Sequence, residues 1–517
     1  MLALAPLNVD ILPDDCAVLK GLLVKLHAQY GAAIEAMHQQ ILKLRHAQFG
    51  ASSERLSTQT DLFAEILDLP LPPVVKQKIS YERQRKGRPA LPKDLPRQRI
   101  EYHLDDQQMA EFDSVKPIGE EVSETLQYTP ARLVVLEHAR IKYACTKDGQ
   151  STVRTAYAQP SPLPKCNADA SLLAQILTAT FADHVPLNRQ SMIFGRHGFP
   201  VPRSTLDDWK LGSAELLEVL RSPLIAHTLS APRLHSDDTT VQLRDASKDT
   251  THTSRLWAYL GAGQRQDDQG QDDQGQWVEH PPSVVFEFTR TRQGIHPQRF
   301  LKDYRGYLQI DAYSGYDALL KSGDIVAVGC MAHTRRHFFE VARKDPNPQG
   351  LAAQALAWIA KLYEIESHIK EHPPDKKLLT RQTQSRPVLD QFHTWLAGHA
   401  PSIPARSELG QAFGYALRQW ETLVRYTEDG ILMPDNNLIE SAIRPVAVGR
   451  RSWLFLGAER GGHVAATMYS LIGTCRLNGV EPYAWLCDVL KRLPNHPVTK
   501  LAELLPFNWK RQSITQT

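Results

Sequence analysis

The chain has 517 residues, of which 42% are hydrophobic and 23% are charged, which is typical of a globular protein with about three domains. Lysine and arginine number 60 against 57 aspartate and glutamate residues, so the formal net charge is only +3. This balance excludes nucleic-acid binding through a global positive charge, and any basic surface must be local. There is no apolar run of about eighteen residues, and Pro6 interrupts the N-terminal MLALAPLNVD. We therefore expect a cytoplasmic protein with no membrane span.

The six cysteines contain no C-x-x-C pair, which favours reduced thiols over a disulfide framework or a complete zinc ribbon.

The first region, 1–73, contains a heptad pattern. Between residues 15 and 48, apolar side chains recur in alternating steps of four and three, at Leu19, Leu23, Leu26, Tyr30, Ala33 and Met37. This periodicity predicts a helix that either self-associates as a coiled coil, making a dimer or higher homo-oligomer, or packs on its own domain.

Residues 74–100 read as a basic linker with three prolines, and a region spanning 101–168 follows it. The prolines disfavour a helix, while the cations suit a phosphate backbone. Lys86 and Arg88 flank Gly87 before Pro89, so an extended chain here would lay cations along a minor groove. A solvated linker is the alternative.

Residues 169–225 predict helices with helix-turn-helix spacing. Gly198 and Pro200 break the pattern, and Ser204 is the expected N-cap of the second helix. Arg203 and Lys210 flank that helix and are candidate DNA contacts. An ordinary helical hairpin explains the pattern equally well.

Strand and helix patterns then alternate. Residues 226–345 predict the order βββαβαβα, which is typical of a mixed sheet covered by helices. Residues 346–430 are helical throughout and form an all-helical insertion, residues 431–475 complete the core, and residues 476–517 are again helical.

Three carboxylates are candidates for a metal site. Asp237 and Asp311 each end an apolar strand, and Glu440 lies on the helix NNLIESAIRPVAV. Clustered carboxylates repel one another and recruit a hard cation such as Mg²⁺. Two such ions would activate an attacking oxygen and stabilise the leaving oxygen in phosphodiester displacement.

Longer motifs make the chain resemble transposases of insertion sequences of the sixty-six type. The resemblance covers nearly the whole chain, and its motifs are QFGASSERL, LPRQRIEYHL, FADHVPLNRQSMI, RSTLDDW, LHSDDT, GYLQIDAYSGY, DNN through Glu440 to RP and GRR, LNGVEPYAWL and LLPFNW.

The resemblance implies a multidomain protein with an α/β RNase H-like catalytic core of the DDE class, preceded by an N-terminal coiled coil and a helix-turn-helix. It implies that Asp237, Asp311 and Glu440 are the catalytic residues and hold two Mg²⁺ ions, for which Mn²⁺ can substitute. Side chains alternate along a strand, so only one of Asp237 and Asp238 faces the metals, and we choose Asp237. Beyond Glu440, three arginines are expected to contact DNA phosphates, with plain surface arginines as the alternative: Arg444, Arg450 and Arg451.

Two cysteine patterns are weaker. Cys330-x-x-His333 follows Asp311, and a buried thiol with a capping or phosphate-facing histidine is favoured over metal binding because no second ligand pair is evident. The family commonly has a four-cysteine zinc ribbon, of which only Cys145 is found here, with Asp148 in place of its partner. We therefore expect no structural zinc and a degenerate ribbon in 101–168.

The predicted function is a transposase that binds the terminal inverted repeats of its element, cleaves 3′ strands and joins them to target DNA. Its expected partners are double-stranded DNA, further copies of itself, and small accessory proteins of the same element. The alternatives are a non-catalytic DNA-binding relic that represses transposition, and a nuclease of the same fold without strand transfer.

Overall fold

The structure is a computed structural model that describes residues 20, 133, 135, 142–147, 150–155, 161–164, 166–244, 250–266, 277–321, 323–345 and 347–509. The chain divides into two compact units, Met1–Pro70 with Glu137–Thr517, and Leu71–Leu136. The predicted coil, apart from Lys20, and the linker with Lys86 and Arg88 lie outside the described residues. The described helices and strands belong to the first unit. In the described part of the chain, no helix is long and apolar enough to cross a membrane.

A hairpin precedes the helices. Strand β1 (Lys142–Lys147) pairs antiparallel with β2 (Gln150–Thr155), with Cys145 opposite Thr152.

Helices follow in the region predicted as helix-turn-helix: α4 (Ala170–Phe181), α5 (Leu187–Arg196), α6 (Arg203–Leu217), η2 (Glu218–Leu220) and α7 (Arg221–Leu229). Asp169 caps α4, because its carboxylate accepts a hydrogen bond from the Ser171 amide at 3.0 Å. The predicted N-cap of α6, Ser204, was wrong. Pro202 is the N-cap, so the helix starts two residues earlier than predicted, and the proline side chain has no atom that can accept a capping hydrogen bond.

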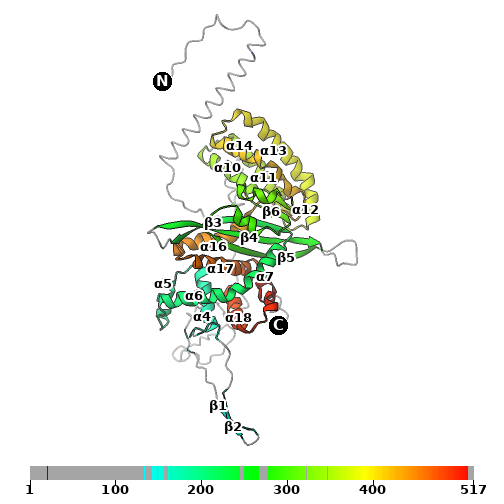
Figure 1. Ribbon diagram of the computed structural model, residues 1–517. Coiled ribbons are helices and arrows are strands. Elements are labelled where there is room, and N and C mark those ends of the chain that lie inside the picture. Colours follow the sequence, from blue (N-terminus) through cyan, green and yellow to red (C-terminus); the bar gives the residue numbers. More distant parts are fainter. Residues whose placement is uncertain are drawn as a thin grey trace, which may run out of the picture. The chain divides into compact units, whose positions relative to one another are not determined.

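The sheet has five strands in the order β5-β4-β3-β6-β7. They are β3 (Arg233–Arg244), β4 (Thr251–Gln266), β5 (Trp277–Thr289), β6 (Gly306–Gln309) and β7 (Ile325–Val328), with α8 (Ile295–Phe300), η3 (Ser314–Tyr316) and α9 (Asp317–Leu320) between them. Strands β3, β4 and β5 form an antiparallel meander (Figure 1). On the other side of β3, strand β6 pairs parallel with β3, and β7 pairs parallel with β6. This mixed sheet confirms the predicted order and is consistent with an RNase H-like core.

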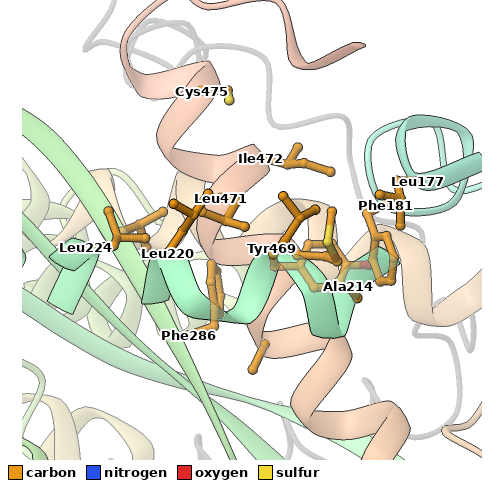
Figure 2. Packing of buried hydrophobic residues seen from close by; sticks show 14 of the residues in the cluster. Leu177, Phe181, Ala214, Leu220, Leu224, Phe286, Tyr469, Leu471, Ile472 and Cys475 are labelled. Atoms are coloured by element: carbon orange, nitrogen blue, oxygen red, sulfur yellow. The ribbon is translucent and has the colours of Figure 1, made fainter. Parts of the chain in front are cut away.

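Both faces of the sheet are buried. On one side of β4, Leu256, Ala258 and Leu260 join the main core, defined here as the cluster between the sheet and helices α4, α6 and α7 with the C-terminal helices. On the opposite side, Trp257 and Tyr259 pack against α8 and α9. Figure 2 shows the main core, with side chains of α4, α6 and α7 directed toward the C-terminal helices and β5. Alternation along the strands therefore sorts the side chains between two faces.

A helical segment separates β7 from the end of the core. It comprises α10 (Met331–Lys344), α11 (Leu351–Ile369), α12 (Pro374–Thr380), η4 (Arg381–Ser385), α13 (Arg386–His399), η5 (Ala400–Ser402), α14 (Glu408–Arg418), α15 (Trp420–Val424) and η6 (Arg425–Thr427). Its own core contains Phe338, Phe392 and Phe413. Arg381 is 2% exposed and bonds both carboxylate oxygens of Glu366 at 2.8 and 2.7 Å, so a buried charge is paired there.

Three longer helices and two short ones end the described chain: α16 (Asn437–Trp453), α17 (Glu459–Leu477), α18 (Pro482–Arg492), η7 (Leu493–Asn495) and η8 (Val498–Leu504). Helix α17 covers the outer edge of β5. The Phe286 amide donates to the Ser470 hydroxyl at 2.7 Å, and the Val284 amide donates to the Thr474 hydroxyl at 3.1 Å. These bonds satisfy edge amides that would otherwise template aggregation.

Glycine allows the close approach of α17 to β5. A Cβ atom at Gly462 would lie 2.5 to 2.7 Å from atoms of the Phe288 ring, whereas one at Gly461 meets nothing within 4 Å. Gly462→Ala should therefore lower the free energy of unfolding by about 1–3 kcal/mol through overpacking.

Gly461→Ala is the matched control on the same helix and should stabilise the protein by roughly 0.5–1 kcal/mol. Thermal unfolding followed by circular dichroism measures both. Equal effects of the two substitutions would contradict this packing.

Candidate active site

Strand register brings Asp237 and Asp311 together. The parallel pairing of β3 with β6 places His235 opposite Gln309. Asp237 lies two residues after His235, and Asp311 lies two residues after Gln309. Neighbouring parallel strands keep this register, so the two carboxylates come from corresponding positions of adjacent strands.

The third carboxylate arrives on a helix that Asn436 attaches to β3. Asn436 is fully buried at the N-cap of α16, and Glu440 lies in the first turn. The side chain of Asn436 bonds the His235 ring at 2.8 Å and donates to the Ser236 carbonyl at 3.0 Å. Burial lowers the pKa of His235 to about 3, so the ring is neutral and its Nδ1 donates to the Asn436 oxygen. One side chain thus joins the start of α16 to the strand segment before Asp237.

The segment just before α16 is also hydrogen-bonded to residues at and beyond the start of α10. The backbone N–H of Asn436 donates to Cys330 Sγ at 3.2 Å, and the backbone N–H of Met331 donates to the Pro434 carbonyl at 2.9 Å. Tyr363 of α11 donates to the Asp435 carboxylate at 2.9 Å. Residues from β3, α10 and α11 therefore fix the position from which Glu440 projects.

The electrostatics of Asp237 suit a hard cation. Burial is the main cause that raises its pKa from 3.8 to about 7, and the negative charges of Asp311, Asp238 and Glu440 contribute to the same shift. One Glu440 oxygen, Oε1, is buried without a hydrogen-bond partner. Carboxylate oxygens that repel one another and remain unsatisfied are the donors that Mg²⁺ prefers. The residues therefore fit a divalent cation.

Asp238 points to the other face of β3. Its side chain is 2% exposed, and it bonds Arg255 at 2.8 Å and Arg292 at 2.8 Å. The guanidinium of Arg292 also lies 4.2 Å from the centre of the Tyr313 ring. Two arginines neutralise Asp238, so of the adjacent pair Asp237 is the one directed toward Asp311 and Glu440.

Helix α10 places His333 and Arg336 beside Glu440. Arg336 donates to Glu440 Oε2 at 3.3 Å, and His333 Nδ1 lies 3.8 Å from Oε1. Burial lowers the pKa of His333, and burial raises that of the Cys330 thiol to about 12. The ligand atoms of Cys330, His333 and Glu440 lie within 4.8 Å of one another. The Cys330 thiol is buried, as predicted, and the His333 ring faces Glu440.

The predicted arginines of α16 differ in their surroundings. Arg444 and Arg451 are exposed. Arg450 donates to the Thr239 hydroxyl at 3.1 Å and to the carbonyl and hydroxyl of Thr240 at 2.8 Å, so it ties α16 to β3. Phosphate contact remains a prediction for these arginines, and the geometry favours it for Arg444 and Arg451.

Helices α5 and α6 differ in charge. Arg203 is exposed at the start of α6, but Lys210 pairs with Asp207 at 2.5 Å. Helix α5 contains no acidic residue. It exposes Arg189, Met192 and Arg196, which share one helical face because they are three and four residues apart. Sequence reasoning missed this face, although the absence of acidic residues in LNRQSMIFGR was a readable signal.

Comparison with known proteins identifies the chain. Residues 165–464 match the family described as Transposase IS66 family, and residues 470–507 match the IS66 C-terminal element. The chain belongs to the IS66 transposase family. Residues 36–100 match the family described as Transposase C of IS166 homeodomain, a leucine-zipper family that hints at oligomerisation. The predicted resemblance to IS66 transposases, which belong to the DDE class, is confirmed.

Related curated proteins come from Sinorhizobium fredii and Escherichia coli. The S. fredii protein y4hP, described as uncharacterised, is 36% identical over 452 residues, covering 84% of this chain and 79% of the relative. The uncharacterised y4jD of the same organism is 31% identical over 518 residues, covering 95% and 99%. The uncharacterised YuaK of E. coli is 64% identical over 48 residues, covering 9% and 51%.

The expectation of no structural zinc was wrong. Residues 111–147 match the zinc-finger binding domain of transposase IS66, so zinc is expected there. The error came from counting cysteines, because Zn²⁺ also accepts histidine nitrogen and carboxylate oxygen. Within this range the structure describes Leu133, Val135 and the backbone of β1, so no zinc ligand is assigned.

The raised pKa of Asp237 predicts a pH-dependent stability in metal-free protein. Between pH 3.8 and about 7 the folded state keeps a proton that the unfolded state releases, so stability falls as the pH rises through this window. Asp237→Asn should raise the Tm by a few degrees at about pH 8 and change it little at about pH 4.

Differential scanning calorimetry in buffer without Mg²⁺ measures this, and Asp303→Asn is the control because its side chain is 81% exposed. Added Mg²⁺ should raise the Tm of wild type and not of Asp237→Asn. An equal Tm difference at both pH values would contradict the burial of Asp237.

Proposed function

We propose that this IS66 family transposase binds the terminal inverted repeats of its element, cleaves the 3′ strands and transfers them to target DNA. The observation that supports this most is the placement of Asp237 on β3, Asp311 two residues beyond β6 and Glu440 on α16, near enough for the charges of Asp311 and Glu440 to act with burial in raising the pKa of Asp237 to about 7. Family membership implies DNA cleavage and strand transfer as the activity.

In this proposal the three carboxylates hold divalent cations. Bound there, two cations activate an attacking oxygen and stabilise the leaving oxygen of the phosphodiester. Asn436 and Arg450 keep Glu440 and α16 against β3. The Asp238 carboxylate is bonded by Arg255 and Arg292, so it adds no further ligand to the site.

The cationic groups near the carboxylates would orient the DNA. Arg336 already bonds Glu440 and is half exposed at 55%, so it can exchange this partner for a phosphate. Arg444 lies one helical turn beyond Glu440 and shares its face of α16. Both side chains neutralise phosphate charge without occupying the positions of the carboxylates.

Further partners follow from the other regions of the chain. Self-association through the predicted N-terminal coil would let two copies hold the two ends of one element, and minor-groove contacts by Lys86 and Arg88 would assist them. Small accessory proteins of the element are expected to take part.

The triad is tested by cleavage and strand-transfer assays on the element's terminal repeats with Mg²⁺. Asp237→Asn, Asp311→Asn and Glu440→Gln should each lower both products by about a thousandfold or more while binding the ends as well as wild type does. Asp303→Asn, at an exposed carboxylate outside the site, should keep full activity.

Other outcomes select the alternatives. A wild-type protein that binds ends but never cuts, even with Mn²⁺ and accessory proteins, is a DNA-binding relic. One that cuts without joining is a nuclease of the same fold. Full activity in any triad variant would remove that residue from the site.

End binding through α5 is tested by salt dependence. Removing one cation that binds a phosphate should reduce the slope of log Kobs against log salt by about 0.9, so the double variant Arg189→Ala with Arg196→Ala should reduce it by roughly 2. Lys210→Ala is the control and should leave the slope unchanged, because Lys210 pairs with Asp207. Fluorescence anisotropy measures the binding. A reduced slope with Lys210→Ala and an unchanged slope with the α5 double variant would assign the DNA contact to α6 instead.

A further inference from the structure

Large apolar side chains are exposed at the C-terminal end of α16. Leu454 is 65% exposed and Phe455 is 43% exposed, and Val448 on the helix is 46% exposed. Single exposed apolar residues are common, but adjacent ones on a held segment mark an interaction surface. Nothing in the proposed roles of the carboxylates or of α5 uses them.

The backbone forces these two side chains outward. Leu454 has a φ of 63°, a left-handed conformation that side-chain-bearing residues seldom adopt. Trp453 and Leu456 pack against the main core on either side. The Leu456 amide donates to the Gln242 carbonyl at 2.7 Å, and the Arg244 amide donates to the Leu456 carbonyl at 2.8 Å. Two partly buried side chains therefore flank Leu454 and Phe455, which are themselves exposed to solvent.

Leu454 and Phe455 are called the apolar tip here, and the charge around this tip favours an anionic partner. No acidic residue occurs between Glu440 and Glu459, a stretch that contains Arg444, Arg450 and Arg451. Arg451 lies eleven residues after Glu440, which places it within about 20° of the same helical face. One face of α16 thus leads from the carboxylates past exposed arginines to the apolar tip. This continuity favours DNA over a lipid surface or a second copy of the chain.

We propose that Leu454 and Phe455 insert into the base stack of DNA held at the carboxylate site. Apolar side chains between bases unstack a step and kink the duplex, while flanking arginines neutralise the phosphates. Leu454 lies fourteen residues after Glu440, or about 21 Å along a helix, which equals about six base pairs of B-DNA. The inference rests on the proposed function, because it needs DNA at Asp237, Asp311 and Glu440.

The test uses the full-length protein in buffer without Mg²⁺ or Mn²⁺, with duplexes that carry the element's terminal repeat. 2-Aminopurine replaces one base at a time across the first dozen or so positions. With wild type, fluorescence should rise several-fold at a position about six base pairs from the cleavage site. The double variant Leu454→Ala with Phe455→Ala should lose this rise and bind roughly tenfold more weakly. Its salt slope should stay unchanged, because it removes no cation.

Controls separate unstacking from misfolding. Leu454→Gly removes the apolar side chain and suits the left-handed backbone, so it should raise the Tm while weakening the fluorescence rise. Phe455→Trp should retain the rise. Leu379→Ala is the matched control, because Leu379 is also 65% exposed but lies on α12.

Three results would overturn the inference: a full fluorescence rise in the double variant, DNA binding by wild type with no rise at any position, or a change in oligomeric state as the sole effect of the double variant. No Mg²⁺ or Mn²⁺ is present in this test, so these outcomes do not depend on cleavage. Failure of the triad assay with an intact fluorescence rise would instead remove only the proposed catalysis.

Discussion

The bonds of Asn436 are the constraint on which the site depends. More than one hundred residues separate Asp311 from Glu440, and most of them fold as a helical segment with its own core. The chain must therefore return to β3 with high accuracy. Asn436 achieves this by bonding the His235 ring and the Ser236 carbonyl, one residue before Asp237. Buried hydrogen bonds of this kind favour one register, because each alternative leaves polar groups unpaired.

The cost of the arrangement is electrostatic. Asp237 experiences the charges of Asp311 and Glu440, Asp435 also experiences that of Glu440, and burial raises the pKa of Asp435 as well as that of Asp237. The fold limits the repulsion by assigning the other acids specific partners. Asp435 accepts a hydrogen bond from Tyr363, and Asp238 binds two arginines on the opposite face of the strand. The charge that remains unneutralised is concentrated where a divalent cation would offset it.

Much of this was predictable from sequence, for reasons that individual residues make clear. The alternation and length of the runs around Trp257 and Phe286 predicted the strands, and their order predicted the sheet. That Asp237 rather than Asp238 is the catalytic residue stays a prediction. It agrees with the contacts of Asp238, which bonds two arginines instead. Ser204 failed as a cap because local propensity does not determine where a helix starts. The role of Asn436 in bonding α16 to β3 could not be predicted, since its partners lie about two hundred residues away. Zinc was missed because ligand sets are broader than cysteine.

Helix α16 links the carboxylate site to the apolar tip because β3 holds it along its whole length. Asn436 bonds the strand at His235, Arg450 bonds it at Thr240, and Leu456 bonds it at Gln242. The 17 residues of α16 span about 26 Å, and β3 from His235 to Leu243 also spans about 26 Å. The two elements therefore match in length and are joined at both ends. A helix fixed in this way cannot slide or rotate without breaking buried bonds, so the position of Glu440 and that of Leu454 are set together. In the proposed complex, DNA at the carboxylates would therefore meet the far end of α16 at a set distance.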